Sequence, residues 1–174
     1  MHEVTVTAVG RDRPGIVAGV TGVFLELGCN LADCTMTRLG GQFAMILLVE
    51  VPDEVGVERL REALKDPAGQ FGLDVSTRDA KGPSVPEDHL SYVISVYGAD
   101  RPGIVHEIAK ELASAGVNIA DLVSHVVGDN IYTMILEVEL PPDADAAGLE
   151  RRLQAAAEGI GLDVTLRPME ASEL

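Results

Sequence analysis

The sequence has few basic residues. Lysine and arginine together number 13, against 28 aspartates and glutamates, and the formal net charge of the 174 residues is −15. The deficit runs along the whole chain, because residues 1–80 carry 7 basic and 12 acidic residues and residues 81–174 carry 6 and 16. Direct binding to nucleic acid or to an anionic membrane surface needs a basic face. We therefore expect neither kind of partner.

Cysteines and long apolar runs are also scarce. The chain contains 2 cysteines, Cys29 and Cys34, and no apolar run approaches the roughly 18 residues of a membrane-spanning helix. The N-terminus, Met1 to Val4, lacks the basic segment and apolar stretch of a secretory signal. We therefore expect a cytoplasmic protein with reduced cysteines. No Cys/His cluster has metal-ligand spacing, so neither a metal nor another cofactor is expected.

An internal repeat fills nearly the whole chain. The hexapeptide Asp12 to Val17, Asp-Arg-Pro-Gly-Ile-Val, recurs unchanged from Asp100 to Val105. Further identities follow in the same register, with one insertion: Gly10 with Gly98, Gly28 with Gly116, Asn30 with Asn118, and Met45 to Leu47 with Met134 to Leu136. We therefore expect one domain at residues 1–79 and a second at 89–170. Residues 80–88, with their glycine, prolines and charges, are the expected linker.

Each copy has the same order of predicted elements. A strand leads through a turn into a helix with an apolar stripe, and a glycine ends that helix. Two strands joined by a tight turn, a second helix and a last strand complete the copy. The predicted strands are 4–8, 31–39, 43–51, 73–78, 90–97 and 162–167, and the predicted helices are 16–27, 55–65, 104–115 and 144–158. The order βαββαβ predicts an α+β fold of two tandem ferredoxin-like domains, each a four-stranded antiparallel sheet with two helices on one face.

The longest identical run joins the first strand to the first helix. Asp12 or Arg13 is the expected N-cap, with Pro14 in the first helical turn. This interpretation explains the motif as a helix start alone. A second interpretation adds Asn30, which follows the first helix. The helix N–H groups would bind the carboxylate of a small zwitterion, and Asp12 or Asn30 would bind its ammonium group. Spacing alone leaves both interpretations open.

These motifs resemble those of the ACT domain. The hexapeptide is followed by Gly-Cys-Asn-Leu-Ala-Asp in the first copy and by Gly-Val-Asn-Ile-Ala-Asp in the second. The resemblance covers residues 3–79 and 90–169. It implies a βαββαβ fold that regulates amino-acid metabolism by binding small ligands, usually amino acids, at domain interfaces. The tandem arrangement is similar to that of the glycine cleavage system transcriptional repressor group.

The resemblance also implies which residues bind the ligand. The family's ligand loop falls on residues 10–15 and 98–103, and its second-strand asparagine on Asn30 and Asn118. Some members supply a loop histidine where this chain has Gly10 and Gly98, which removes one polar contact and leaves room for a closer backbone approach. The expected ligand-binding residues are Gly10, Arg11, Asp12, Arg13, Gly15, Asn30, Gly98, Asp100, Arg101, Gly103 and Asn118.

We therefore expect a non-catalytic regulator. Its expected ligand is an amino acid, with glycine or serine as first choices, and its expected partner is a protein such as a transcription regulator, so that control of transcription is indirect. A ligand-free adaptor that binds proteins through exposed edge strands is the alternative. An acylphosphatase-like enzyme is disfavoured, because Pro14 and Pro102 each remove an N–H group from the loop that would hold phosphate. Association into a homodimer is left open.

Overall fold

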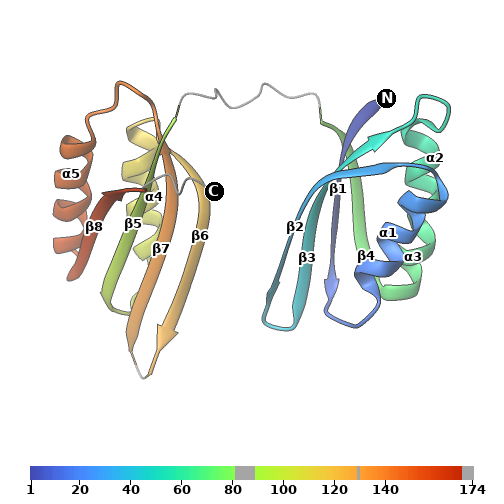
Figure 1. The fold of residues 1–174 in the computed structure, drawn as a ribbon. Helices are drawn as coiled ribbons and strands as arrows, with labels where there is room; N and C mark the ends of the chain where they lie inside the picture. The colour runs from blue at the N-terminus through green and yellow to red at the C-terminus, as the bar shows by residue number, and fades with distance from the viewer. Residues whose placement is uncertain (81–88, 129, 170–174) are drawn as a thin grey trace. The chain divides into compact units, whose positions relative to one another are not determined.

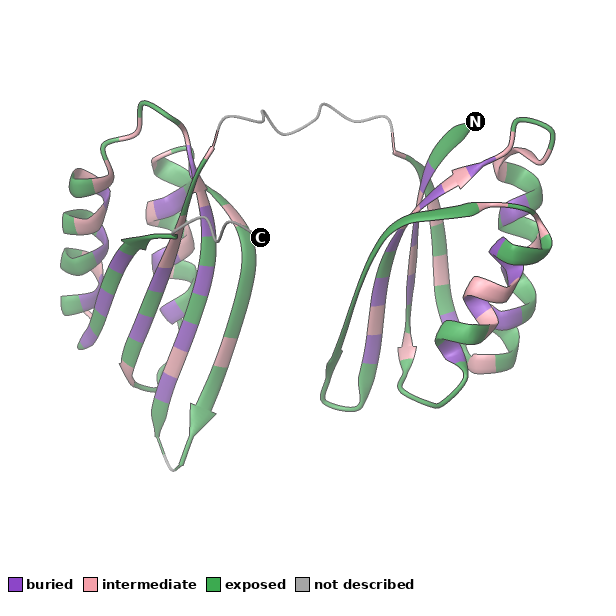
Figure 2. Ribbon diagram, viewed as in Figure 1, coloured by how far each residue is buried: buried purple, intermediate pink, exposed green. Residues whose placement is uncertain are grey.

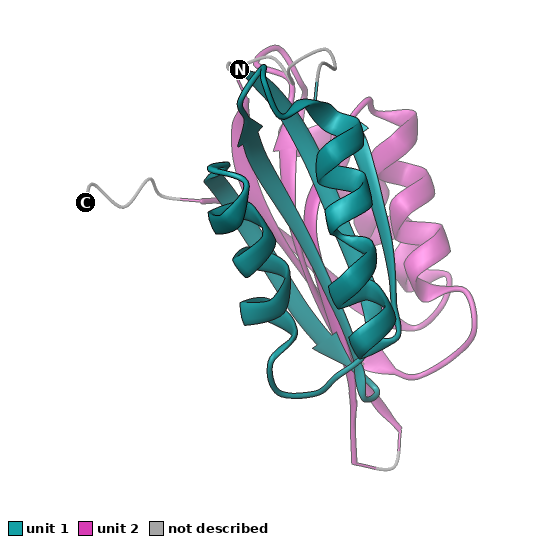
Figure 3. Ribbon diagram, turned by 90° about the vertical axis from the view of Figure 1, so that its right-hand side faces the viewer, with its two compact units in different colours: residues 1–83 teal, residues 84–174 magenta. Residues whose placement is uncertain are grey.

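The computed structural model describes residues 1–80, 89–128 and 130–169. The chain divides into two compact units, Met1–Pro83 and Ser84–Leu174 (Figure 3). The predicted linker, residues 80–88, lies outside the described residues except for Ala80, whose N–H donates to the carbonyl of Glu3 at 2.9 Å. Within the described ranges, no helix combines the length and the apolar character needed to cross a membrane.

The first unit is an antiparallel sheet with helices on one face (Figure 1). Its four strands have the order β2-β3-β1-β4, and each neighbouring pair is antiparallel. The elements are β1 (His2–Arg11), α1 (Ile16–Glu26), β2 (Asn30–Leu39), β3 (Gln42–Val51), α2 (Gly56–Ala63), α3 (Lys65–Phe71) and β4 (Leu73–Asp79).

The second unit repeats this topology. Its four strands have the order β6-β7-β5-β8, again antiparallel throughout. The elements are β5 (Leu90–Ala99), α4 (Ile104–Ser114), β6 (Asn118–Val127), β7 (Ile131–Leu140), α5 (Ala146–Glu158) and β8 (Leu162–Pro168). The predicted α+β fold of two tandem ferredoxin-like domains is confirmed.

The central strands of each sheet bury one face and expose the other, whereas β2 and β6 at the edge have no buried residue (Figure 2). Along β3 the buried residues alternate with less buried ones from Phe43 to Val51, and β7 repeats this pattern from Tyr132 to Leu140. The alternation follows from strand geometry, in which successive side chains point to opposite faces. The buried face and the apolar stripes of the helices form one hydrophobic core in each unit.

Local signals in the sequence predicted the chain reversals correctly. Gly28 has φ 67°, and its N–H and that of Cys29 donate to the carbonyls of Leu25 and Phe24 at 3.2 and 2.8 Å. This is the bonding pattern of a Schellman motif, which requires a left-handed residue after the helix. The β2–β3 hairpin turns at Gly40 and Gly41, both with positive φ, as a tight two-residue turn requires.

The predicted second helix of the first unit, 55–65, is wrong in its extent. The structure has two shorter helices, α2 and α3, which meet at Leu64 and continue to Phe71. Pro67 lies in the first turn of α3. Because proline has no N–H and its ring clashes with the carbonyl four residues earlier, it interrupts the helical hydrogen bonding at Ala63. The second unit has no proline at this place, and α5 runs unbroken.

Candidate functional site

The loop between β1 and α1 ends in a left-handed glycine. Gly15 is the residue before the helix, with φ 95°, and no side chain caps α1. Gly103 occupies the same position before α4, with φ 98° and again no side-chain cap. The prediction that Asp12 or Arg13 caps the helix is therefore wrong. The helices begin at Ile16 and Ile104 as predicted, but the residue before each is a glycine in the left-handed conformation, which glycine adopts at low cost.

Asp12 is held by the β2–β3 hairpin instead of the helix. Its N–H donates to the carbonyl of Gly41 at 3.0 Å, and its Oδ2 accepts a hydrogen bond from Nη1 of Arg38 at 3.1 Å. Asp100 has the same backbone bond, to the carbonyl of Asn130 at 2.9 Å. Each loop is thus anchored to the neighbouring hairpin in the same way. In the first unit the hairpin also supplies a guanidinium group beside the loop carboxylate.

The expected asparagines lie far from these loops within their own units. Asn30 pairs with Glu50 on β3, whereas Gly10 pairs with Phe43. Seven residues of strand separate the two positions, or about 23 Å at 3.3–3.4 Å per residue. Nδ2 of Asn30 donates to Oε2 of Glu50 at 2.9 Å. The expectation that the loop and the asparagine meet within one unit is wrong, because the antiparallel register places them at opposite ends of the sheet.

The second unit repeats this separation. Asn118 pairs with Glu139, and its Nδ2 donates to Oε2 of that residue at 2.8 Å. Gly98 pairs with Tyr132, again seven residues away on the central strand. The asparagine–glutamate hydrogen bond is therefore a repeated feature of the fold, at the opposite end of the sheet from the loop.

Glycine at the start of each loop is required by packing. A Cβ on Gly10 would lie 2.7 Å from Cδ2 of Leu73 and 2.9 Å from the carbonyl oxygen of Gly72. A Cβ on Gly98 would lie 2.5 Å from Cδ2 of Leu162. The space left by the missing side chain is thus filled by the neighbouring edge strand. The expectation that Gly10 and Gly98 leave room for a ligand to approach the backbone is therefore wrong, because the edge strand occupies that space.

A groove of about 700 Å³ opens beside the first loop, between α1 and β2. Its lining includes the charged residues Asp12, Arg13 and Arg38 and the apolar residues Val17, Met36 and Phe43. Val17 and Met36 expose 45% and 52% of their surface, whereas Phe43 is buried. The volume lies in the range typical of small-molecule sites, which combine apolar walls with a few polar groups. The groove brings together Asp12, Arg13 and Gly15 from the expected set.

Arg38 and Met36 were missed by the sequence analysis. Arg38 lies 26 residues from Asp12 along the chain and reaches it through the β2–β3 hairpin. One signal was available, because the aligned position of the second copy, beside Tyr132 on β7, is Val126. The two copies therefore differ at this strand position, which is basic in the first copy and apolar in the second.

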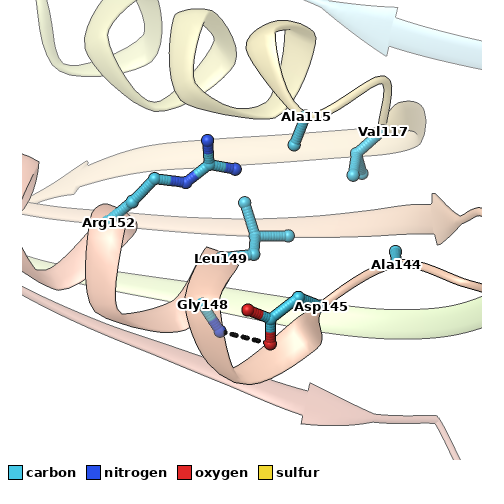
Figure 4. A pocket seen from close by; sticks show the side chains of 7 residues that line it. All are labelled: Ala115, Val117, Ala144, Asp145, Gly148, Leu149 and Arg152. Atoms are coloured by element: carbon cyan, nitrogen blue, oxygen red, sulfur yellow. Dashed lines mark hydrogen bonds between the residues drawn. The ribbon is translucent and has the colours of Figure 1, made fainter.

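A second groove, of about 380 Å³, lies in the second unit between α4 and α5. Asp145 already caps α5, since its Oδ1 accepts a hydrogen bond from the N–H of Gly148 at 2.8 Å, and Arg152 extends toward α4 (Figure 4). The groove has a packing cause: Ala115 stands where the first copy has Leu27, which packs against the core. None of the expected ligand-binding residues lines this groove, so it is a gap between helices.

The described residues offer no arrangement of metal ligands. Within residues 1–80, 89–128 and 130–169, no group of three or more His, Cys, Asp or Glu side chains could hold a metal ion. Asp12 of the first loop forms an ion pair with Arg38, and both side chains are partly exposed. Such a pair suits the binding of a charged small molecule.

The repeated fold and loop agree with a comparison against family models. The model of the ACT domain matches residues 2–78 and 91–167, which together make up most of the chain. The chain belongs to the ACT domain family. It carries two tandem ACT domains, one in each unit.

Known proteins resemble the chain over one or both copies. A protein of the UPF0237 group from Methanopyrus kandleri is 42% identical over 76 residues, which cover 43% of this chain and 84% of that protein. The glycine cleavage system transcriptional repressor of Escherichia coli is 27% identical over 159 residues, covering 88% of this chain and 83% of that protein. A crystal structure of an unknown protein from Galdieria sulphuraria has a TM-score of 0.84 and 29% identity, covering 97% of this chain and 98% of that one.

Proposed function

We propose that this protein is a non-catalytic regulator that binds a free amino acid at its β1–α1 loops and thereby changes its affinity for a partner protein. The observation that carries the proposal is the loop itself, which occurs twice with the same backbone anchor. In both units a left-handed glycine leaves the first-turn N–H groups of an 11-residue helix without a side-chain cap, and in the first unit Asp12 lines the same groove as Gly15 and Ile16. Helix N–H groups and a carboxylate together complement a zwitterion.

The full set of expected binding residues implies a site shared by two ACT domains. Asn30 and Asn118 lie at the opposite end of the sheet from the loop of their own unit. An asparagine can therefore reach a loop only when a second ACT domain supplies it, as the family resemblance implies. Ligand bound there would stabilise one association of domains over another. Coupling of this kind is typically worth about 1–3 kcal/mol.

We propose that the regulated partner is a transcription regulator of amino-acid metabolism, since the Escherichia coli relative is itself a transcriptional repressor of the glycine cleavage system. The net charge of −15 supports indirect control, because an acidic protein is better suited to a partner with a basic face than to DNA. We place the protein in the cytoplasm. The two free cysteines agree with this location, and burial raises the pKa of the Cys29 thiol, which keeps that thiol protonated.

Thermal unfolding of the full chain in the presence of each of the twenty amino acids tests the proposal. A ligand that binds the native state at a concentration of a hundred times Kd adds about 2.7 kcal/mol to the free energy of unfolding. We expect at least one amino acid to raise Tm by several degrees, and glycine and serine are the first to be measured. A flat response across all twenty would contradict ligand binding and would favour the adaptor function.

A further inference from the structure

The two loops differ in the side chain that faces the loop aspartate. In the first unit, Nη1 of Arg38 lies 3.1 Å from Oδ2 of Asp12. Arg38 pairs with Phe43 near the end of β2, and in the second unit Val126 pairs with Tyr132 at the matching place. The loop of Asp100 therefore has an apolar residue where the loop of Asp12 has a guanidinium group.

The guanidinium group of Arg38 remains accessible to a ligand. Its side chain is 67% exposed, whereas that of Asp12 is 32% exposed. Arginine has five N–H donors, and only one of them bonds Asp12. The remaining donors can bind a carboxylate in the two-pronged geometry that arginine favours. Asp12 stays available beside it for an ammonium group, so opposite charges are placed side by side as in a zwitterion.

Apolar walls continue from this ion pair. Val17 on α1 and Met36 on β2 expose about half of their surface to the groove, and buried Ile16 and Phe43 complete it. Glycine would leave these walls in contact with water. A ligand with an aliphatic or thioether side chain would cover them, and burial of apolar surface is favourable by roughly 25 cal/mol per Å².

We propose that the groove of the first unit selects an amino acid with an apolar side chain, that Arg38 binds its carboxylate, and that the second unit lacks this site. This inference rests on the proposed function and narrows it. An amino acid with an apolar side chain replaces glycine and serine as the first choice, Arg38 binds the carboxylate in place of the helix N–H groups, and one of the two loops binds the ligand. In the second unit Met36 is replaced by Ser124 and Arg38 by Val126. The loop arginine of the second unit, Arg101, lies against Gly161. Its Nη2 is 3.2 Å from the position that a Cβ on Gly161 would occupy.

Isothermal titration of the full chain with L-leucine, L-methionine and glycine tests this inference. We expect one molecule of leucine or methionine to bind per chain, at least tenfold more tightly than glycine. Arg38→Val should weaken leucine binding at least tenfold, because it copies the second unit, and Arg38→Lys should lose less because it keeps the charge. The matched control Val126→Arg, at an exposed position, should leave the first site unchanged. Tm without ligand should stay the same in all three variants, which separates binding from folding.

The outcomes distinguish this inference from the proposed function. Leucine binding that is unchanged in Arg38→Val would overturn the role of Arg38 while leaving the regulator proposal intact. Glycine that binds as tightly as leucine would overturn the selection of an apolar side chain. Two equivalent leucine sites per chain would overturn the difference between the units. If none of the twenty amino acids binds the unmodified chain, the proposed function and this inference fail together.

Discussion

Gly10→Ala is expected to destabilise the first unit by about 1–3 kcal/mol, the usual range for overpacking a tight contact. The added Cβ would lie 2.7 Å from Cδ2 of Leu73 and 2.9 Å from the backbone oxygen of Gly72. The leucine side chain can rotate away, but the carbonyl belongs to the backbone of Gly72, which directly precedes β4, so the entry into the edge strand must shift. Urea unfolding of the full chain, followed by circular dichroism, measures the loss.

The matched control for this prediction is Gly22→Ala. Gly22 lies inside α1, has no positive φ, and a Cβ there would meet no atom within 4 Å. Alanine is about 1 kcal/mol better than glycine inside a helix. The same chemical change is therefore expected to lower stability at one glycine and to raise it at the other. Equal effects at both positions would contradict the packing role assigned to Gly10.

Asp12→Ala is expected to weaken amino-acid binding at least tenfold. The substitution removes the carboxylate that would bind the ligand's ammonium group. At a ligand concentration of a hundred times the original Kd, the stabilisation should fall from about 2.7 to about 1.4 kcal/mol. Stability without ligand should change by less than about 1 kcal/mol, because an exposed ion pair such as Asp12 with Arg38 contributes little. Thermal unfolding with and without L-leucine measures both quantities.

Asp100→Ala is the control in the second unit. It removes the same residue from the same loop anchor, at a place with no arginine in the position of Arg38. We expect leucine binding to be unchanged in this variant. Equal losses in the two variants would show that both loops bind the ligand and would contradict the difference between the units. Unchanged binding in both would remove the aspartates from the site.

The fold was predictable from the sequence because its signals are local and occur twice. The repeated hexapeptide defined the two units, and Gly28 and Gly116, with φ 67° and 68°, end the first helix of each as expected. The Gly40-Gly41 turn set the β2–β3 hairpin. The apolar stripes of the helices and the alternating pattern of the strands then predicted, for each unit, one sheet with helices on a single face. The split of the second helix at Leu64 also had a local cause in Pro67, which the apolar pattern alone did not reveal.

The arrangement of the site was less predictable, because it depends on pairing between distant segments. Asn30 was expected near Asp12, but the register of β2 against β3 places it beside Glu50, at the other end of the sheet. The same register brings Arg38 to Asp12. This contact could not be predicted from the local sequence around either residue. The residue before α1 is Gly15 in the left-handed conformation, not the predicted cap Asp12 or Arg13. The positions of Asn30 and Arg38 follow from the pairing of the hairpin strands, whereas the cap at Gly15 is a local property of the glycine backbone.

The most direct test of the account is to locate the ligand on the protein. The full chain of 18.4 kDa is small enough for backbone amide spectra by NMR, and titration with L-leucine would report the residues that contact it. We predict shifts concentrated at residues 12–18 of the loop and helix start and at residues 36–38 of β2, and no comparable shifts at residues 100–106 of the second unit. Shifts confined to the groove around Arg152, or the absence of any shift at saturating concentrations of all twenty amino acids, would contradict a ligand site at the first loop.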